Sequence, residues 1–307
     1  KINGDTSVEG DEDFVVELGR AHLENAAFGN NRSGHLSMVG TILTDDLPDS
    51  TQYLLAAQRV GQNGVRRYSS DGLFLDTWLT ENTAGASPNA GMCFAPNGDV
   101  MVTRFNSTTD GPILFSRNGA PRLRRFATGS GVQFNSHESC FYDPSGNIYI
   151  GQAGVLSSTD ADVPVLKFSA SGVLLDTFEV PTGERGTDWI ELDANQCTLY
   201  YTSEDSDVRR YDVCTHQVMT DFTSLPEAPC YALRQLPNRD LMITCINNIF
   251  RYDQNAVYIR AYSRESLGES DPDGLYAIQL DPDGETFWTG GVTSGRVVRA
   301  RLDDGTV

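Results

Sequence analysis

Hydrophobic and polar residues alternate over short stretches along most of this chain, and polar turns separate these stretches. In one example, residues 198–202 and 208–213 are rich in β-branched and aromatic side chains, and the acidic stretch 204–207 lies between them. Alternation with a period of two, bounded by turn residues, is typical of antiparallel hairpins. No stretch has the apolar period of an amphipathic helix. The pattern therefore predicts an all-β protein.

The hairpin pattern repeats along the chain. The segment VRRYSSDGLFLDTWL at 65–79 returns as VLKFSASGVLLDTFEV at 165–180, and weaker copies occur elsewhere. An aromatic residue marks the copies at Tyr68, Phe115, Phe168, Tyr211 and Tyr252, spaced by 47, 53, 43 and 41 residues. Before each copy stands a short apolar strand, a turn and another strand, as in CFYDPSGNIYIG. Repeats of this length with four short strands are the signature of a β-propeller.

The repeats predict a single propeller over residues 33–307, with six four-stranded antiparallel blades. Its blades fall at approximately 33–85, 86–131, 132–186, 187–227, 228–270 and 271–307. Residues 1–32 form an acidic leader. The last repeat ends before a fourth strand, whereas the apolar stretch 13–18 has no repeat of its own. We expect strand 13–18 to close the ring beside residues 296–302, within the chain or in a neighbouring copy by strand addition.

The six cysteines predict disulfides. If the turn at 204–207 is symmetric, Cys197 faces Cys214 across its hairpin. Cys230 begins a strand and Cys245 ends the next, so they face each other too. Cys93 and Cys140 occupy nearly equivalent places in successive repeats, which leaves a third bridge open. No C-x-x-C pair or zinc-type spacing occurs. Disulfides persist in oxidising compartments, so we expect a secreted or cell-surface protein.

Charge excludes one class of partner. With 23 basic and 42 acidic residues the net charge is −19, which repels nucleic-acid phosphates and anionic membranes. No apolar run approaches the ~20 residues of a membrane span. The chain begins at Lys1 without a charged and apolar leader, as in a mature, processed form. Sequons at Asn31 and Asn106 are either glycosylation sites or chance matches.

One group of polar residues is a candidate site. The innermost strands of a propeller begin at one mouth of the channel, so residues just ahead of them converge there. Aligned by their turns, these residues are Ala90, Glu138, Asp188, Tyr231 and Tyr276, and one position earlier Asn89, His137, Thr187, Cys230 and Leu275. We select Glu138, Asp188, His137 and Asn89 as candidate ligands of a divalent cation such as Ca²⁺ or Mg²⁺, or as acid–base groups. The alternative is that they only bond channel loops and water, and no cofactor is required.

The DPxG and PNG turns, followed by strands such as NIYI and DVMVT, resemble those of a known group. They are similar to six-bladed propellers of the NHL, regucalcin/gluconolactonase and virginiamycin B lyase type, over residues 33–307. Residues 188–291 most resemble uncharacterised secreted bacterial propellers. The resemblance implies a fold that lactonases, lyases and non-enzymatic surface proteins share. Gluconolactonases of this group typically bind a divalent metal through Glu, Asn and Asp. Their Asn-Gly pair is absent here, because the chain has Asn89-Ala90-Gly91 and Pro229-Cys230-Tyr231.

The sequence lacks familiar catalytic motifs: it has no G-x-S-x-G, H-E-x-x-H, P-loop or dinucleotide fingerprint. This favours a secreted or cell-surface module without enzymatic activity. Such a module binds a protein or glycan at the cell surface, or assembles with itself as a structural subunit of an extracellular polymer. The alternative is a divalent-metal-dependent lactonase or lyase, with its site at the channel mouth.

Overall fold

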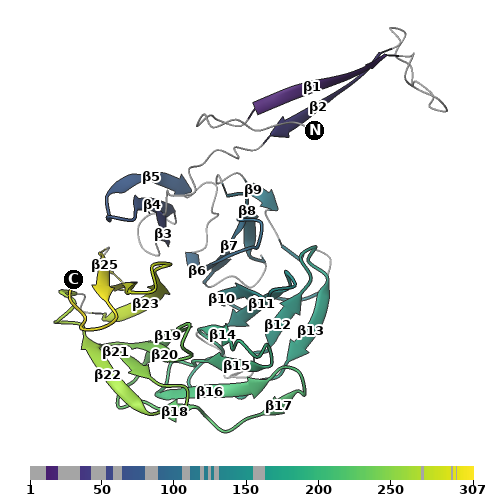
Figure 1. Cartoon of the computed structure of the whole chain (residues 1–307). Helices are drawn as coiled ribbons and strands as arrows, with labels where there is room; N and C mark the ends of the chain where they lie inside the picture. The colour runs from purple at the N-terminus through teal and green to yellow at the C-terminus, as the bar shows by residue number, and fades with distance from the viewer. Residues whose placement is uncertain are drawn as a thin grey trace. The chain divides into compact units, whose positions relative to one another are not determined.

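The computed structural model describes residues 12–19, 35–42, 53–57, 64–79, 89–105, 111–117, 121–123, 126–127, 131–154, 163–270, 273–291, 293–294 and 296–307. Within these residues every regular element is a β-strand, and every strand pair whose register is described is antiparallel (Figure 1). The all-β expectation is therefore confirmed. The chain divides into two compact units, residues 1–54 with 69–73 and residues 55–68 with 74–307.

The first unit holds a two-stranded hairpin. Strand β1 (Glu12–Gly19) pairs with β2 (His35–Ile42), so that Asp13 faces Thr41 and Leu18 faces Leu36. This pairing uses one edge of residues 13–18. Their expected position beside residues 296–302, within the chain or in a neighbouring copy, stays a prediction. Strands close in sequence pair at a lower cost in loop-closure entropy than strands at opposite ends of the chain.

The remaining strands form six further sheets. In chain order the strands are β3 (Tyr53–Ala57), β4 (Val65–Ser69), β5 (Phe74–Leu79), β6 (Asn89–Phe94), β7 (Val100–Arg104), β8 (Ile113–Phe115), β9 (Pro121–Leu123), β10 (His137–Tyr142), β11 (Ile148–Gln152), β12 (Val165–Phe168) and β13 (Leu174–Phe178). They continue as β14 (Ile190–Leu192), β15 (Thr198–Tyr201), β16 (Asp207–Asp212), β17 (Gln217–Val218), β18 (Thr223–Ser224), β19 (Cys230–Gln235), β20 (Leu241–Cys245), β21 (Asn248–Tyr252), β22 (Tyr258–Ser263), β23 (Leu275–Leu280), β24 (Thr286–Gly291) and β25 (Val297–Arg301).

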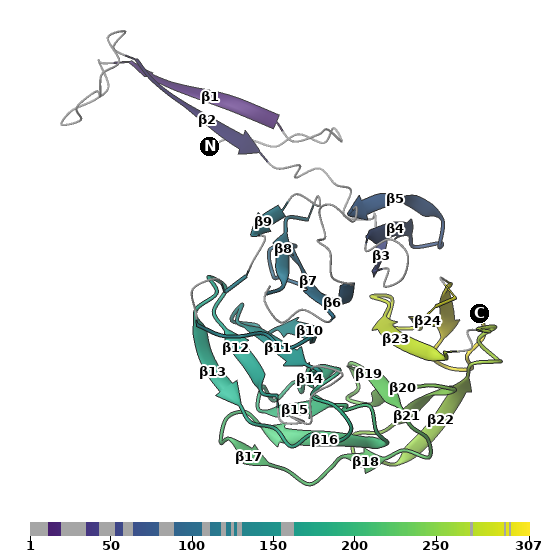
Figure 2. The ribbon, with the colours of Figure 1, turned by 180° about the vertical axis from the view of Figure 1, so that it is seen from behind.

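Within each sheet the strands follow one another in chain order. The sheets β6–β9, β10–β13 and β19–β22 have four strands each. The sheet β14–β18 has five, because both β17 and β18 pair with β16. Among the residues described, β3–β5 and β23–β25 have three strands each. The first strands of successive sheets, β6, β10, β14, β19 and β23, contact one another in that order. In both views β10, β14 and β19 lie on the inner side of their sheets and β13, β17 and β22 on the outer side (Figures 1 and 2).

Apolar side chains fill the spaces between successive sheets. One cluster joins the β6 and β10 sheets and includes Met101 and Ile150, both buried. A second joins the β10 and β14 sheets through Tyr149, Phe178 and Leu199. The largest extends from Trp189 to Leu302, across the sheets of β14, β19 and β23. Burial on both faces explains the continuous apolar runs of second strands such as β11 and β20.

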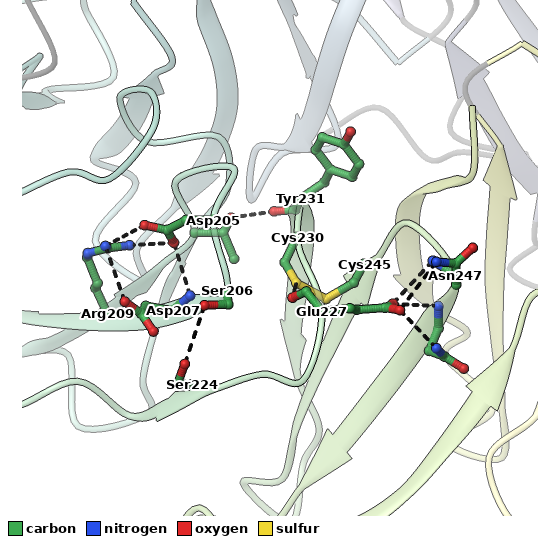
Figure 3. The surroundings of a disulfide bond; sticks show 12 residues. Asp205, Ser206, Asp207, Arg209, Ser224, Glu227, Cys230, Tyr231, Cys245 and Asn247 are labelled. Atoms are coloured by element: carbon green, nitrogen blue, oxygen red, sulfur yellow. Dashed lines mark hydrogen bonds and ion pairs between the residues drawn. A yellow bond between two sulfur atoms is a disulfide. The ribbon is translucent and has the colours of Figure 1, made fainter. Parts of the chain in front are cut away.

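All six cysteines are bridged. Cys93–Cys140 ties β6 to β10, Cys197–Cys214 lies at the β15–β16 hairpin, and Cys230–Cys245 joins β19 to β20 (Figure 3). The two expected pairs are formed, and the third pair was left open by the sequence. Three disulfides are typical of proteins in an oxidising environment.

The expected register of the β15–β16 hairpin was wrong by one residue. Thr198 faces Asp212, and the N–H of Val213 donates to the carbonyl of Cys197 at 2.8 Å. Cys214 therefore lies one residue beyond the position opposite Cys197. The Cα atoms of the two cysteines are still 5.2 Å apart, within the range of a disulfide.

Two other expectations concern the surface. In the part of the chain that the structure describes, no helix is long and apolar enough to cross a membrane. The sequons at Asn31 and Asn106 lie outside the described residues, so glycosylation there stays a prediction.

Candidate functional site

The first strands of four sheets each contain a β-bulge or register shift at an equivalent position, and these positions supply the side chains of the candidate site. Pairing shifts register between Asn89 and Met92 in β6, His137 and Ser139 in β10, Cys230 and Leu233 in β19, and Leu275 and Ala277 in β23. A β-bulge leaves a residue out of the ladder and turns its side chain in a new direction. Glu138, Tyr231 and Tyr276 occupy these positions, so the same bulge presents one side chain from each of three sheets.

The three bulged side chains meet. The hydroxyl of Tyr276 donates to Oε2 of Glu138 at 3.2 Å, although the two residues lie 138 positions apart in the sequence. The rings of Tyr231 and Tyr276 have centroids 5.0 Å apart. Glu138 is buried, with 2% of its surface exposed. A buried carboxylate thus accepts a hydrogen bond from one tyrosine, whose ring packs against a second.

Arg185 brings a positive charge to Glu138. Its guanidinium lies 3.5 Å from Oε1 of Glu138, forms a second ion pair with Glu204, and covers the ring of Phe105 at 5.1 Å. The backbone around Arg185 is fixed, because the hydroxyl of Ser203 bonds its carbonyl. The loop that carries Arg185 can pack this closely against β11 because residue 186 is a glycine. An added Cβ there would lie 2.0 Å from the carbonyl oxygen of Gln152.

Asp188, two residues before β14, lies in the same carboxylate cluster as Glu138 and Glu204. Its negative charge is the least balanced by hydrogen bonds. It is 2% exposed, and within the described chain both of its carboxylate oxygens are buried without a hydrogen-bond partner. Burial raises the pKa of Asp188 well above its ordinary value, and the charges of Glu138 and Glu204 raise it further against the opposing effect of Arg185. When all are ionised, the carboxylates of Glu138, Asp188 and Glu204 carry three negative charges against the single positive charge of Arg185. The excess negative charge would attract another cation.

Threonines from the second strands hold the bulges in place. The hydroxyl of Thr103, in β7, donates to the carbonyl of Glu138 at 2.7 Å, in the next sheet. Thr202, which follows β15, bonds the carbonyl of Tyr231 in the same way. These contacts fix the backbone of two site residues from a neighbouring sheet.

The other two candidates from the sequence have different partners. Nδ1 of His137 accepts the N–H of Arg104 at 2.8 Å, and the imidazole packs edge-on to Phe134 at 5.3 Å. The amide of Asn89 donates to the carbonyl of Gly64 at 3.2 Å. Their role as metal ligands stays a prediction, as it does for Glu138 and Asp188.

Sequence reasoning missed Arg185 and Glu204, and it named Tyr276 as aligned without selecting it. Arg185 and Glu204 lie in loops between strands, where periodicity carries no information about which side chains meet. The available signal was the alignment of bulge positions, because Tyr276 and Glu138 are equivalent in their repeats.

A second group with metal-type side chains is Cys197, Asp212 and Cys214. Its two sulfurs form a disulfide, so neither is a thiolate able to bind a metal. Oδ1 of Asp212 accepts the N–H groups of Cys214 and Thr215, at 2.8 and 2.9 Å. In the described chain, the oxygen donors of Asp188 and Glu138 are the better match to a hard cation such as Ca²⁺ or Mg²⁺.

Neither a protein-family model nor a curated protein matches this sequence. Solved structures do match. A protein of unknown function from Bacteroides caccae has a TM-score of 0.63 and 13% identity, over 84% of this chain and 92% of its own. A gluconolactonase from Xanthomonas campestris has a TM-score of 0.62 and 12% identity, over 80% and 81% of the two chains. A structural-genomics target provisionally described as a gluconolactonase has a TM-score of 0.60 and 10% identity, over 80% and 91%.

Identities this low show the fold alone. The chain therefore has a propeller-like fold similar to that of gluconolactonases.

Proposed function

We propose that this chain hydrolyses lactones with the help of a divalent cation, at a site formed by Glu138 and Asp188. The observation that carries the proposal is the buried carboxylate of Asp188, whose oxygens lack hydrogen-bond partners in the described chain beside a second buried carboxylate. The gluconolactonases of similar fold favour this function over the non-enzymatic module that the sequence alone favoured.

The residues at the site suit this chemistry. Glu138 and Asp188 would hold the cation, and a bound divalent cation would polarise the lactone carbonyl as a Lewis acid. Tyr276 orients the carboxylate of Glu138 through its hydroxyl. The neighbouring rings of Tyr231 and Tyr276, tilted by 49° to each other, give a lactone ring apolar surface to pack against. Hydrolysis adds water to the carbonyl carbon and breaks the ring C–O bond, leaving a hydroxy acid.

The architecture and location belong to the same proposal. We take the six sheets β3–β25 as six blades, because the first strands of five of them follow one another in contact. Three disulfides support secretion or display at the cell surface.

A second candidate is the binding or assembly module expected from the sequence, with a protein, a glycan or another copy of the chain as partner. Arg185 favours it, because this guanidinium already pairs with Glu138 and Glu204. A buried ion network can serve structure alone.

Cation binding tests the proposal directly. Wild type, Asp188→Asn and the control Asp281→Asn are stripped with EDTA and titrated with CaCl₂ or MgCl₂, following the melting temperature. Asp281 is also buried, but its carboxylate accepts a hydrogen bond from Trp288 and forms an ion pair with Arg299. We expect a cation at a hundred times its Kd to stabilise wild type and the control by about 2.7 kcal/mol, and Asp188→Asn not at all.

Hydrolysis of glucono-δ-lactone and γ-butyrolactone by the cation-loaded protein is then followed in a pH-stat. We expect turnover by wild type and Asp281→Asn but not by Asp188→Asn. Wild type without a cation response would refute the metal site. A cation response without turnover would refute the lactonase and favour the binding module.

A further inference from the structure

A pocket lies at the far ends of the strands that form the carboxylate cluster. It has a volume of about 350 Å³, which is in the range of small-molecule sites. Its walls come from the ends of β6, β10 and β14 and the turns that follow them. The lining residues include Phe94, Phe141, Tyr142, Asp143, Glu191 and Leu192. Glu138 and Tyr142 are four residues apart on β10, which places the pocket about 13 Å from the cluster along the strand.

The aromatic wall of the pocket is rigid. The ring of Phe141 stacks on Tyr149 with centroids 4.6 Å apart and planes 14° apart. Tyr149 in turn stacks on the buried Phe178 at 6.0 Å and 7°, and Lys167 lies 4.8 Å over its ring. A ring held in this way loses little rotamer freedom when a ligand stacks on it, so binding costs less conformational entropy.

Phe94, at the end of β6, also lines the pocket, and 55% of its surface is exposed. The exposure of Phe94 beside the stacked Phe141 gives the pocket an apolar edge that a flat ring would cover.

The carboxylate of Glu191 is also held in place. Nη1 of Arg234 donates to its Oε2 at 3.2 Å, while the Arg234 guanidinium lies 4.7 Å over the ring of Trp189 and bonds Gln279 at 3.0 Å. Arg234 balances the charge of Glu191, and a carboxylate can accept further hydrogen bonds. The carboxylate of Asp143 is not a comparable acceptor for a ligand, because its oxygens already accept hydrogen bonds from Ser145 and Asn147 in the same turn.

We propose that this pocket is a second ligand site, separate from the Glu138–Asp188 cluster, for a small, flat, uncharged ring compound with an O–H or N–H donor. The ring lies between Phe94 and Phe141, and the donor reaches Glu191. Anions are disfavoured by the net charge of −19. A cation gains little, because Arg234 already neutralises Glu191.

The experiment titrates 4-methylphenol into the protein in EDTA, following saturation transfer to the ligand by NMR. Anisole, which has no donor, and 4-methylbenzoate, which is an anion, are titrated in parallel. Phe94→Ala is compared with Phe74→Ala, a phenylalanine of matched exposure at 56% that lies on β5. Leu192→Trp fills the pocket, and melting temperatures show which variants are folded.

We expect saturable binding of 4-methylphenol in the millimolar range, and about fivefold weaker binding to Phe94→Ala. Folded Leu192→Trp should lose binding, whereas Phe74→Ala and Asp188→Asn should keep it. No saturable binding to wild type, or equal weakening by Phe94→Ala and Phe74→Ala, would overturn the site. Anisole or 4-methylbenzoate binding as tightly as 4-methylphenol would overturn the ligand class. Loss of binding in Asp188→Asn would overturn the separation of the two sites, and none of these results depends on lactone hydrolysis.

Discussion

Asp188 is a residue whose burial works against stability. Its carboxylate oxygens are buried, have no hydrogen-bond partner in the described chain, and lie near the charges of Glu138 and Glu204. An asparagine has nearly the same shape without the charge. In EDTA we therefore expect Asp188→Asn to raise the free energy of unfolding at pH 8 by about 1–3 kcal/mol, measured by urea denaturation. A less stable variant would contradict this and indicate that Asp188 has a favourable partner.

The same residue predicts a dependence on pH. Because the pKa of Asp188 is raised in the folded chain, the folded chain keeps a proton that the unfolded chain releases above about pH 4. The stability due to this group is therefore full below pH 4 and is lost as pH rises through the folded pKa. The advantage of Asp188→Asn should be close to zero near pH 4 and grow toward pH 8. A difference that stays constant with pH would exclude titration of Asp188 as its cause.

At the scale of elements, threonines at the ends of second strands position the bulges of the next sheet. Thr103 donates to the carbonyl of Glu138 and also accepts the N–H of Gly91 at 2.7 Å. Thr103→Val keeps the shape but removes both bonds. We expect a loss of about 1–3 kcal/mol in unfolding free energy, together with weaker cation binding. Thr103→Ser keeps the hydroxyl and is the control, and equal losses in both variants would assign the effect to packing.

The disulfides differ in what they connect. Cys93–Cys140 joins the first strands of two sheets across 47 residues, whereas Cys197–Cys214 closes a local hairpin of 17 residues. Constraint of the unfolded chain grows with loop length, within a typical 2–4 kcal/mol per bridge. We expect the double Ala variant of the first pair to lose more stability in urea than that of the second. The opposite order would show that hairpin geometry outweighs chain entropy.

The strands were predictable from the sequence because alternation and turn residues act locally. The run from Cys140 to Gly151 shows this, since its turn at Pro144 and its two strands are as expected. Contacts made by loops were not predictable. Arg185 reaches Glu138 and Glu204 only because Gly186 lets the loop approach β11. Repeat alignment placed His137 next to Glu138 among the candidates, but it cannot show that the His137 imidazole accepts the N–H of Arg104.

For the whole molecule, charge opposes folding while apolar layers favour it. The net charge of −19 comes from 42 acidic and 23 basic residues spread over the chain. Many arginines are used in ion pairs with nearby acids, as in Arg209–Asp205 and Arg251–Asp240. Acidic residues are in excess, and mutual repulsion of like charges destabilises a compact state. The sheets stay together because apolar clusters fill the spaces between them.

Salt should therefore stabilise the protein through screening alone. At 0.15 M ionic strength the Debye length is about 8 Å, and near 1 M it falls to about 3 Å, which weakens repulsion between exposed carboxylates. In EDTA we expect a rise of about 2–4 °C in melting temperature between these conditions, equivalent to roughly 1 kcal/mol. NaCl and choline chloride should act equally, in wild type and in Asp188→Asn alike, because screening depends on ionic strength rather than on the cation. A rise with NaCl only would instead indicate a bound sodium ion, and no rise with either salt would show that surface repulsion does not limit stability.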